Sequence, residues 1–234
     1  MQKLFVQAYD IYSHKMCQDN ITNRSRWLCD NIWQQTLLSN PRLNKAFFKL
    51  LSAVPLKTCQ YMYLKLNDTS TLAYRRFVHD NPGDRINRTR KSVIDSLISH
   101  FGECDYNNYN NTIRKPSMLI KTHILDKGYF EINNTEYNVD FNTKLHIIVS
   151  GFLYTLRNDT MHGSSISISK SSMANMATFA NSYYAFLLLY YLTVMLFIYN
   201  NIADYDSNVY DELAENILDN TERYKKLFGK HLNK

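Results

Sequence analysis

Apolar residues recur at helical spacing through most of the first 101 residues. Pro41 and Pro55 separate three such stretches within residues 3–79, and Pro41 is interpreted as a stop. After the turn sequence Asn81-Pro82-Gly83-Asp84, the pattern predicts a further helix over residues 88–101. The apolar stripes of the three stretches before that turn consist of Trp27, Leu28, Ile32, Trp33, Leu37 and Leu38; of Leu43, Phe47, Leu50, Leu51 and Val54; and of Tyr61, Tyr63, Leu64 and Leu66.

The second half of the chain combines helical spacing with one short alternating stretch. Alternation on both sides of Asn133-Asn134 predicts a small β-hairpin within residues 129–141. We expect a helix capped by Asn142 or Thr143 to follow, then helices over about 173–203 and 211–228. The predicted fold class is therefore mostly α. Residues 103–112 have loop composition, so we predict a boundary between an N-terminal helical region, residues 1–103, and a second domain, residues 113–234.

Residues 171–203 contain no charged side chain, and residues 185–198 are almost entirely apolar. A membrane-spanning helix needs roughly 20 apolar residues, so this segment is a candidate. The tyrosines, however, are spread along it and are not gathered at its two ends as in an interfacial belt. We therefore expect a buried helix that is part of the core or shared between subunits, with a membrane anchor at residues 176–200 as the alternative.

Charge and cysteine usage narrow the class of protein. A net charge of +6 and a pI near 9 suit a polyanionic partner such as RNA. The four cysteines show no metal-ligand spacing, so we predict neither a metal site nor another cofactor. Scattered thiols and a polar start, Met1-Gln2-Lys3, predict a reduced, cytoplasmic protein without a signal peptide.

The segment Leu156–Gly163 brings an arginine and a histidine to the end of a predicted helix. Arg157 can neutralise a phosphate, and His162 can transfer protons near neutral pH. The two lie five residues apart, about 140° around a straight helix, so they meet only if the helix ends near His162. Gly163 suits such an end. Asn158 is placed to orient the imidazole, and Asp159 is the weaker candidate.

The run Arg157-Asn158 with His162-Gly163, set between two long apolar helices, resembles the Arg-x4–6-His signature of the HEPN superfamily. The resemblance covers residues 115–230. It implies a HEPN-like helical bundle, a homodimer and a metal-independent endoribonuclease in toxin, abortive-infection or phage-defence systems. An antitoxin or regulatory protein is a further implied partner. The motif itself does not account for the hairpin or for the N-terminal region, which are interpreted as a recognition or regulatory part or as additional core.

These residues predict RNA cleavage by 2′-hydroxyl attack. Arg157 would bind the non-bridging phosphate oxygens, His162 would transfer protons and Asn158 would orient the site. A second histidine from a dimer mate would supply the other proton transfer. The alternatives are a non-catalytic HEPN-like module that binds RNA or protein, and an arginine and a histidine that only satisfy a helix end. The densest basic stretch contains Arg75, Arg76, Arg85, Arg88, Arg90 and Lys91. We predict that these side chains contact phosphates, with a solvated loop and helix start as the alternative.

Overall fold

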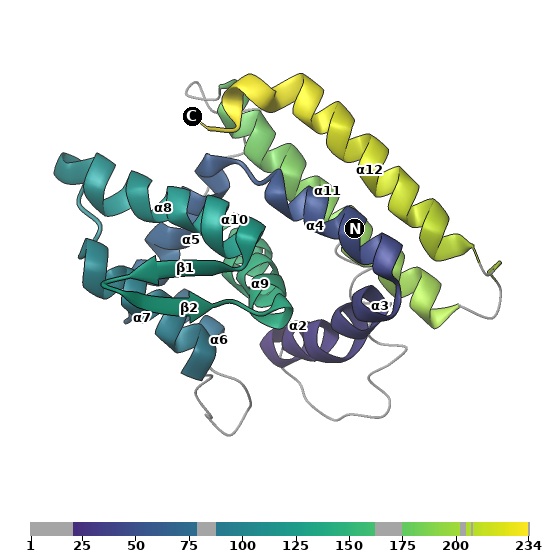
Figure 1. Ribbon diagram of the computed structural model, residues 1–234, viewed down its shortest axis with the longest axis horizontal. Helices are drawn as coiled ribbons and strands as arrows, with labels where there is room; N and C mark the ends of the chain where they lie inside the picture. The colour runs from purple at the N-terminus through teal and green to yellow at the C-terminus, as the bar shows by residue number, and fades with distance from the viewer. Residues whose placement is uncertain (1–20, 79–87, 162–174, 202–204, 207, 234) are drawn as a thin grey trace.

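The computed structural model describes residues 21–78, 88–161, 175–201, 205–206 and 208–233 (Figure 1). Within these ranges the protein is mostly helical, with one two-stranded antiparallel hairpin, as predicted. The helices are α2 (Ile21–Leu28), α3 (Gln34–Ser39), α4 (Pro41–Ser52), α5 (Leu56–Asn67), α6 (Leu72–Val78), α7 (Arg88–Phe101), α8 (Lys115–Leu119), α9 (Phe141–His146), α10 (Tyr154–Met161), α11 (Met176–Asn200) and α12 (Val209–Phe228).

Short segments of π and 3-10 helix join several of these elements. The π segments are η1 (Cys29–Trp33), η3 (Asn110–Arg114), η4 (Ile120–Lys127) and η5 (Ile147–Leu153), and the 3-10 segments are η2 (Tyr106–Asn108) and η8 (Gly229–His231). The interpretation of residues 103–112 as a loop is therefore only partly right, since η2 and the start of η3 lie there.

The helices predicted over residues 88–101, 173–203 and 211–228 are confirmed as α7, α11 and α12 in the described residues. The two prolines act at helix starts. Pro41 is the first residue of α4, where its missing N–H costs nothing, and α5 begins directly after Pro55. The stretch predicted around Tyr61–Leu66 is therefore the second half of a longer helix.

The hairpin pairs β1 (Tyr129–Ile132) with β2 (Thr135–Asn138). Asn133 and Asn134 both have positive φ, 51° and 59°, as a two-residue type I′ turn requires. Phe130 is buried, and its ring stacks on Tyr137 at a centroid distance of 4.9 Å. The predicted hairpin is thus confirmed at the predicted turn.

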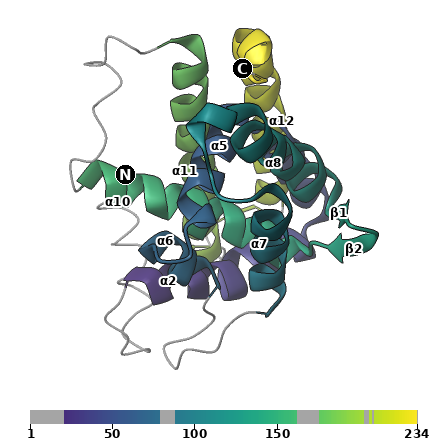
Figure 2. The same ribbon diagram turned by 90° about the vertical axis from the view of Figure 1, so that its left-hand side faces the viewer.

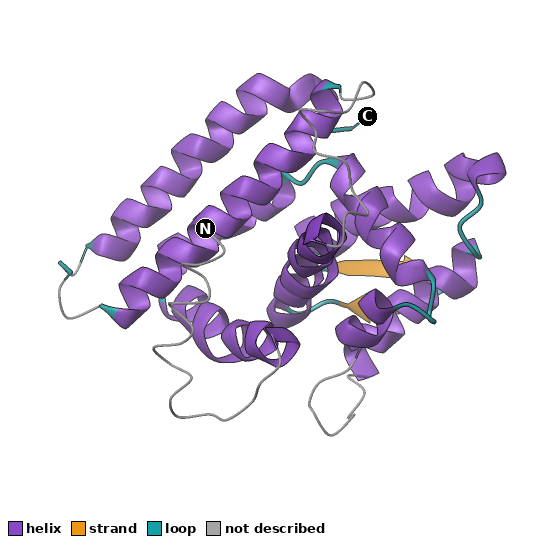
Figure 3. Ribbon diagram, turned by 180° about the vertical axis from the view of Figure 1, so that it is seen from behind, coloured by secondary structure: helices purple, strands orange, loops and turns teal. Residues whose placement is uncertain are grey.

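Three long helices, α4, α11 and α12, run side by side at one end of the molecule, whereas α7, α8 and the hairpin lie at the other (Figure 1; seen from behind in Figure 3). Surface ion pairs join α4 to α12, with Lys49 Nζ 2.8 Å from Glu222 Oε1. Side chains of both predicted domains belong to one hydrophobic cluster. The division at residues 103–112 stays a prediction.

Among the described residues, α11 alone is long and apolar enough to cross a membrane by length and composition. More than half of its most apolar window, 56%, is buried inside the protein. Trp33 Nε1 donates a hydrogen bond to the Leu192 carbonyl at 2.9 Å, which ties α11 to η1. One side of α11 thus packs in the core, and its other side is partly exposed.

A buried polar cluster holds the N-terminal helices against α9. Asp30 Oδ1 accepts a hydrogen bond from Asn142 Nδ2 at 2.9 Å and lies 2.9 Å from Nε2 of the fully buried His146. Arg26 and Arg90 are buried nearby, and their charges act on the imidazole. Asn142 thus links helices and does not cap one.

Burial and the two arginines shift the ionisation of this cluster. Burial lowers the pKa of His146 below its ordinary range, against the opposing effect of Asp30. Burial disfavours the charged Asp30 as well, but hydrogen bonds from His146 and Asn142 bring the pKa of Asp30 below its usual value. The folded protein therefore holds a neutral His146 that donates from Nε2 to an ionised Asp30.

The neutral His146 predicts a stability that falls on mild acidification. In the unfolded chain this histidine takes up a proton near its ordinary pKa of about 6.5, but the folded protein does so only at lower pH. The free energy of unfolding should therefore decrease between neutral pH and about pH 5. In His146→Gln, which keeps a donor toward Asp30, that decrease should be smaller, as measured by urea unfolding across the pH range. His100→Gln, on the exposed part of α7, is the control; equal slopes in all three proteins would contradict the assignment.

Candidate functional site

The helix that carries the Arg157 motif runs through the centre of the protein. It consists of α9, η5 and α10 without a break, from Phe141 to Met161. Asp140 caps its start, because its carboxylate accepts a 2.7 Å hydrogen bond from the Thr143 amide. The predicted caps, Asn142 and Thr143, are thus wrong: the first links to Asp30 and the second is the capped residue.

The middle of this helix is buried on all sides. Every residue from Ile147 to Leu153 is buried, and this is the stretch that takes π geometry. A π segment has a wider turn than an α-helix, so it rotates the residues that follow around the axis. Burial then decreases within one turn, since Tyr154 and Arg157 are only half-buried. The motif therefore lies where a core helix reaches the surface.

Arg157 and Asn158 contact each other directly. Arg157 Nη1 donates a hydrogen bond of 2.9 Å to Asn158 Oδ1, and both side chains are half-buried. This bond uses one of the five N–H donors of the guanidinium and leaves the others for a ligand. His162 and Gly163 lie outside the described residues. The bond predicted between Asn158 and the imidazole therefore stays a prediction.

Asp159 is held by α5. Its Oδ2 accepts a 2.8 Å hydrogen bond from the Tyr61 hydroxyl and lies 2.8 Å from Lys65 Nζ. Burial of Tyr61 and its bond to this carboxylate raise the pKa of Tyr61 well above its ordinary value. Both contacts fix the rotation of α10 about its axis. Asp159 is thus committed to α5, which leaves Asn158 as the stronger candidate to orient His162.

A second cation packs against the motif helix from α6. The guanidinium of Arg76 lies over the ring of Tyr154, 4.7 Å from its centroid, one turn before Arg157. Its charge also acts on Tyr61, and its carbonyl accepts a hydrogen bond from Arg26. Arg76 is therefore a member of the predicted basic stretch that packs against the motif helix one turn before Arg157.

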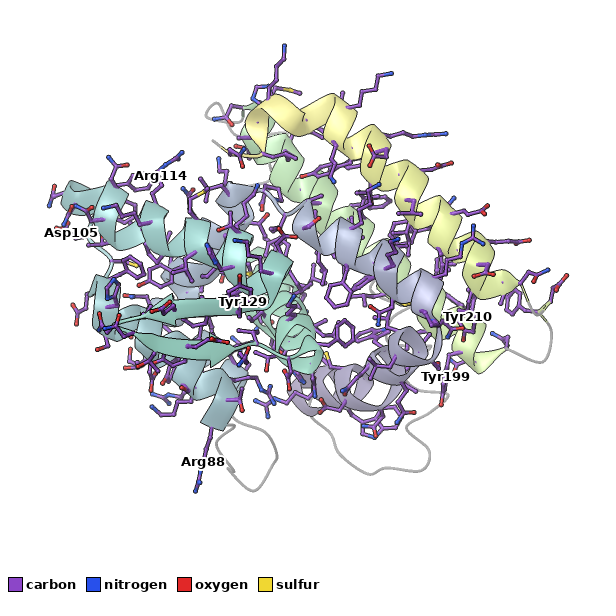
Figure 4. All side chains as sticks on the ribbon, in the orientation of Figure 1. Arg88, Asp105, Arg114, Tyr129, Tyr199 and Tyr210 are labelled. Carbon is purple, nitrogen blue, oxygen red and sulfur yellow. The ribbon has the colours of Figure 1, made fainter. Side chains whose placement is uncertain are left out.

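The other members of the basic stretch are dispersed. Arg75 and Arg88 are exposed, and Arg88 points away from the body of the protein (Figure 4). Arg90 is only 2% exposed, so it does not fit the role of a surface phosphate ligand. Lys91 forms an ion pair with Asp95 on its own helix. Arg85 lies outside the described residues. Sequence proximity grouped these side chains, but α6 and α7 hold the described ones in different surroundings, and one face of α7 is buried.

The sequence pattern did not predict the polar contacts of three side chains on one face of α5, and it assigned one of them, Tyr61, to an apolar stripe. Lys57, Tyr61 and Lys65 recur every four residues, so they share one side of the helix. Lys57 Nζ donates to Thr178 Oγ1 at 2.6 Å, near the start of α11. This face thus connects α10 with α11. The regular polar spacing on an otherwise buried helix was the available signal, but the strong apolar stripe opposite hid it.

No protein-family model, no curated protein and no solved structure matches the chain. Within the described residues, no group of three or more His, Cys, Asp or Glu side chains is placed to hold a metal ion. A polar depression of about 350 Å³ lies between α7 and the hairpin, and no residue of the motif helix lines it. The candidate site therefore consists of Arg157, Asn158, Arg76 and the polar face of α5.

The contact between Tyr61 and Asp159 can be tested through stability alone. Removing the hydroxyl in Tyr61→Phe should lower the free energy of unfolding by about 1 kcal/mol, because a part-buried carboxylate loses a hydrogen bond. A double-mutant cycle with Asp159→Ala, which removes the acceptor, should give a coupling of similar size when measured by urea unfolding. Tyr106→Phe, at a highly exposed hydroxyl, is the matched control. Additive effects of the two substitutions would contradict the contact.

Proposed function

We propose that this protein is a metal-independent endoribonuclease of the HEPN type, acting in phage defence or as a toxin. The observation that carries the proposal is the place of Arg157. Its guanidinium is held by Asn158 at 2.9 Å, where a helix with a fully buried middle reaches the surface, five residues before His162. An arginine fixed on a rigid element and followed closely by a histidine suits phosphate chemistry without a metal.

Each residue has a distinct role in the proposed reaction. The N–H groups of Arg157 that Asn158 does not use bind the non-bridging oxygens of the scissile phosphate and stabilise the charge of the phosphorane. His162 transfers a proton during attack of the 2′-hydroxyl, which expels the 5′-oxygen and leaves a 2′,3′-cyclic phosphate. Asn158 fixes the guanidinium. The other proton transfer falls to the histidine of a second copy, so the active form is a homodimer.

The N-terminal region contributes to RNA recognition in this proposal. Helices α5 and α6 belong to residues 1–103, and both contact the motif helix through Lys65, Tyr61 and Arg76. Lys65 and Arg76, which contact the motif helix at Asp159 and Tyr154, would bind phosphates that flank the cleaved bond. An antitoxin or regulatory protein and a cytoplasmic location complete the proposal on the strength of the family resemblance.

The second candidate is a non-catalytic HEPN-like module that binds RNA or a protein. The observation that favours it is the Lys65–Asp159 ion pair, which shows that one cation at the motif helix already has a structural partner. Under this alternative Arg157→Ala weakens binding, and no cleavage product forms. The two candidates therefore differ in whether a product appears.

Cleavage by purified protein is the first test. Single-stranded labelled RNA incubated with wild type in EDTA should yield products with 2′,3′-cyclic phosphate ends. His162→Ala should abolish cleavage, and Arg157→Ala should lower the rate at least about a hundredfold, because the charge developing on the phosphate loses its main partner. His231→Ala, at another histidine, is the control. Wild-type rates in His162→Ala would disprove the assignment, and binding without product would favour the module.

Flanking phosphate contacts predict a defined salt dependence. In a His162→Ala background, Arg76→Gln should weaken RNA binding and reduce the slope of log K against log salt by about one. Lys91→Gln, at the cation paired with Asp95, should leave both quantities unchanged. Fluorescence anisotropy over a salt series measures them. Equal slopes for Arg76→Gln and its parent would remove Arg76 from the interface.

A further inference from the structure

The side of α11 that faces away from the core carries a continuous row of large apolar side chains. These residues are each between 37% and 44% exposed, and they follow one another at intervals of three or four residues up to Tyr190. The half-buried Val194 continues the row to Phe197. We call this row the α11 stripe; it consists of Met176, Phe179, Tyr183, Phe186, Tyr190, Val194 and Phe197.

Neighbouring rings hold the α11 stripe in place. Tyr183 stacks on Tyr224 of α12 with a centroid distance of 6.0 Å and an interplanar angle of 6°. Phe186 lies 6.1 Å from Tyr183 and 6.2 Å from Tyr190, so the aromatic rings form a ladder. Side chains that are ordered before binding lose little conformational entropy when a partner covers them.

The α11 stripe differs from the other exposed apolar residues in the described part of the chain. Leu38, Leu72 and Leu227 are single side chains on three different helices, as is ordinary on a protein surface. The stripe, by contrast, extends over about 30 Å of one helix without a charged side chain. An uncharged patch of this extent indicates a surface that another molecule covers.

We propose that the α11 stripe is the surface through which two copies of this chain associate, with α11 of one copy packed against α11 of the other. Intervals of three and four residues, as in this stripe, are the spacing by which a helix interlocks with an identical helix. Two-fold symmetry requires a self-complementary surface, and a straight row of similar rings meets that requirement. Interfaces are also enriched in the Phe, Tyr and Met side chains present here.

The exposed area of the stripe is large enough for contact with a second copy of the chain. Side chains of this size expose about 200 Å² each when free, so six that are about 40% exposed offer roughly 500 Å² per copy. Two copies would bury about 1,000 Å², near the lower limit of a specific interface. A membrane fits less well, because Tyr183 and Tyr190 lie within the stripe and not at its ends.

The surface also has the right place relative to the motif. The end of α10 and helix α11 lie toward the same side of the molecule (Figures 2 and 3). The proposed interface would supply the homodimer that the nuclease proposal requires. It rests on the geometry of α11, however, and stands whether or not the protein cleaves RNA.

Sedimentation velocity over a concentration series tests the interface. Wild type should show a monomer–dimer equilibrium, and Phe179→Lys with Phe186→Lys should raise the dimer Kd at least about tenfold per site, because a desolvated ring is replaced by a charge. Leu227→Lys and Leu72→Lys, at apolar residues 60% and 68% exposed but off the stripe, should leave the Kd unchanged. Circular dichroism confirms that each variant is folded.

Phe186 lies at the middle of the stripe, so mixing Phe186→Lys with Phe186→Glu should restore association.

Three results would overturn the proposal: a monomeric wild type throughout the series, a dimer that the stripe variants leave intact, or a monomer that floats with phosphatidylcholine vesicles. RNA cleavage in EDTA, measured on the same samples, separates this proposal from the nuclease proposal. A stable dimer without cleavage contradicts the nuclease but not the interface. Cleavage by an intact monomer contradicts the interface and the shared pair of histidines, but not the nuclease activity itself.

Discussion

Burial of the helix between Phe141 and Met161 is the constraint on which the rest of the structure depends. Seven consecutive residues, Ile147–Leu153, are surrounded by protein, so the other helices must be arranged around them. Polar contacts fix the two ends. Asp140 and His146 hold the first turns, and Asp159 ties the last turns to α5. A helix buried in the middle and anchored at both ends gives the motif side chains a rigid base.

Local pattern predicted the elements well because each one carries its own signal. Apolar spacing located α7, α11 and α12, and the Asn133-Asn134 pair located the hairpin turn. Caps were harder to predict. Asp140, Asn142 and Thr143 are all competent caps, and only the tertiary contact with Asp30 assigns Asn142 to another role. Long-range contacts of this kind leave no trace in local spacing.

The candidate site shows the same division. The sequence located Arg157 and Asn158, because the motif is contiguous, and the structure adds that the two are bonded. The sequence also grouped Arg76 with Arg90. In the structure Arg76 packs on Tyr154, whereas Arg90 is buried. Lys65 and Tyr61 join the site across nearly 100 residues of chain, so only folding reveals them. Helical periodicity assigns a residue to a face but does not say which helix covers that face.

Association through the exposed side of α11 would make the amount of dimer depend steeply on the concentration of the protein. A contact of about 1,000 Å² is small, and such contacts are weak. Well below the dissociation constant, the concentration of dimer rises with the square of the concentration of chain, so doubling the chain gives about four times the dimer. A protein joined through the α11 stripe would therefore be scarce in its assembled form at low expression and would accumulate steeply once expression increased.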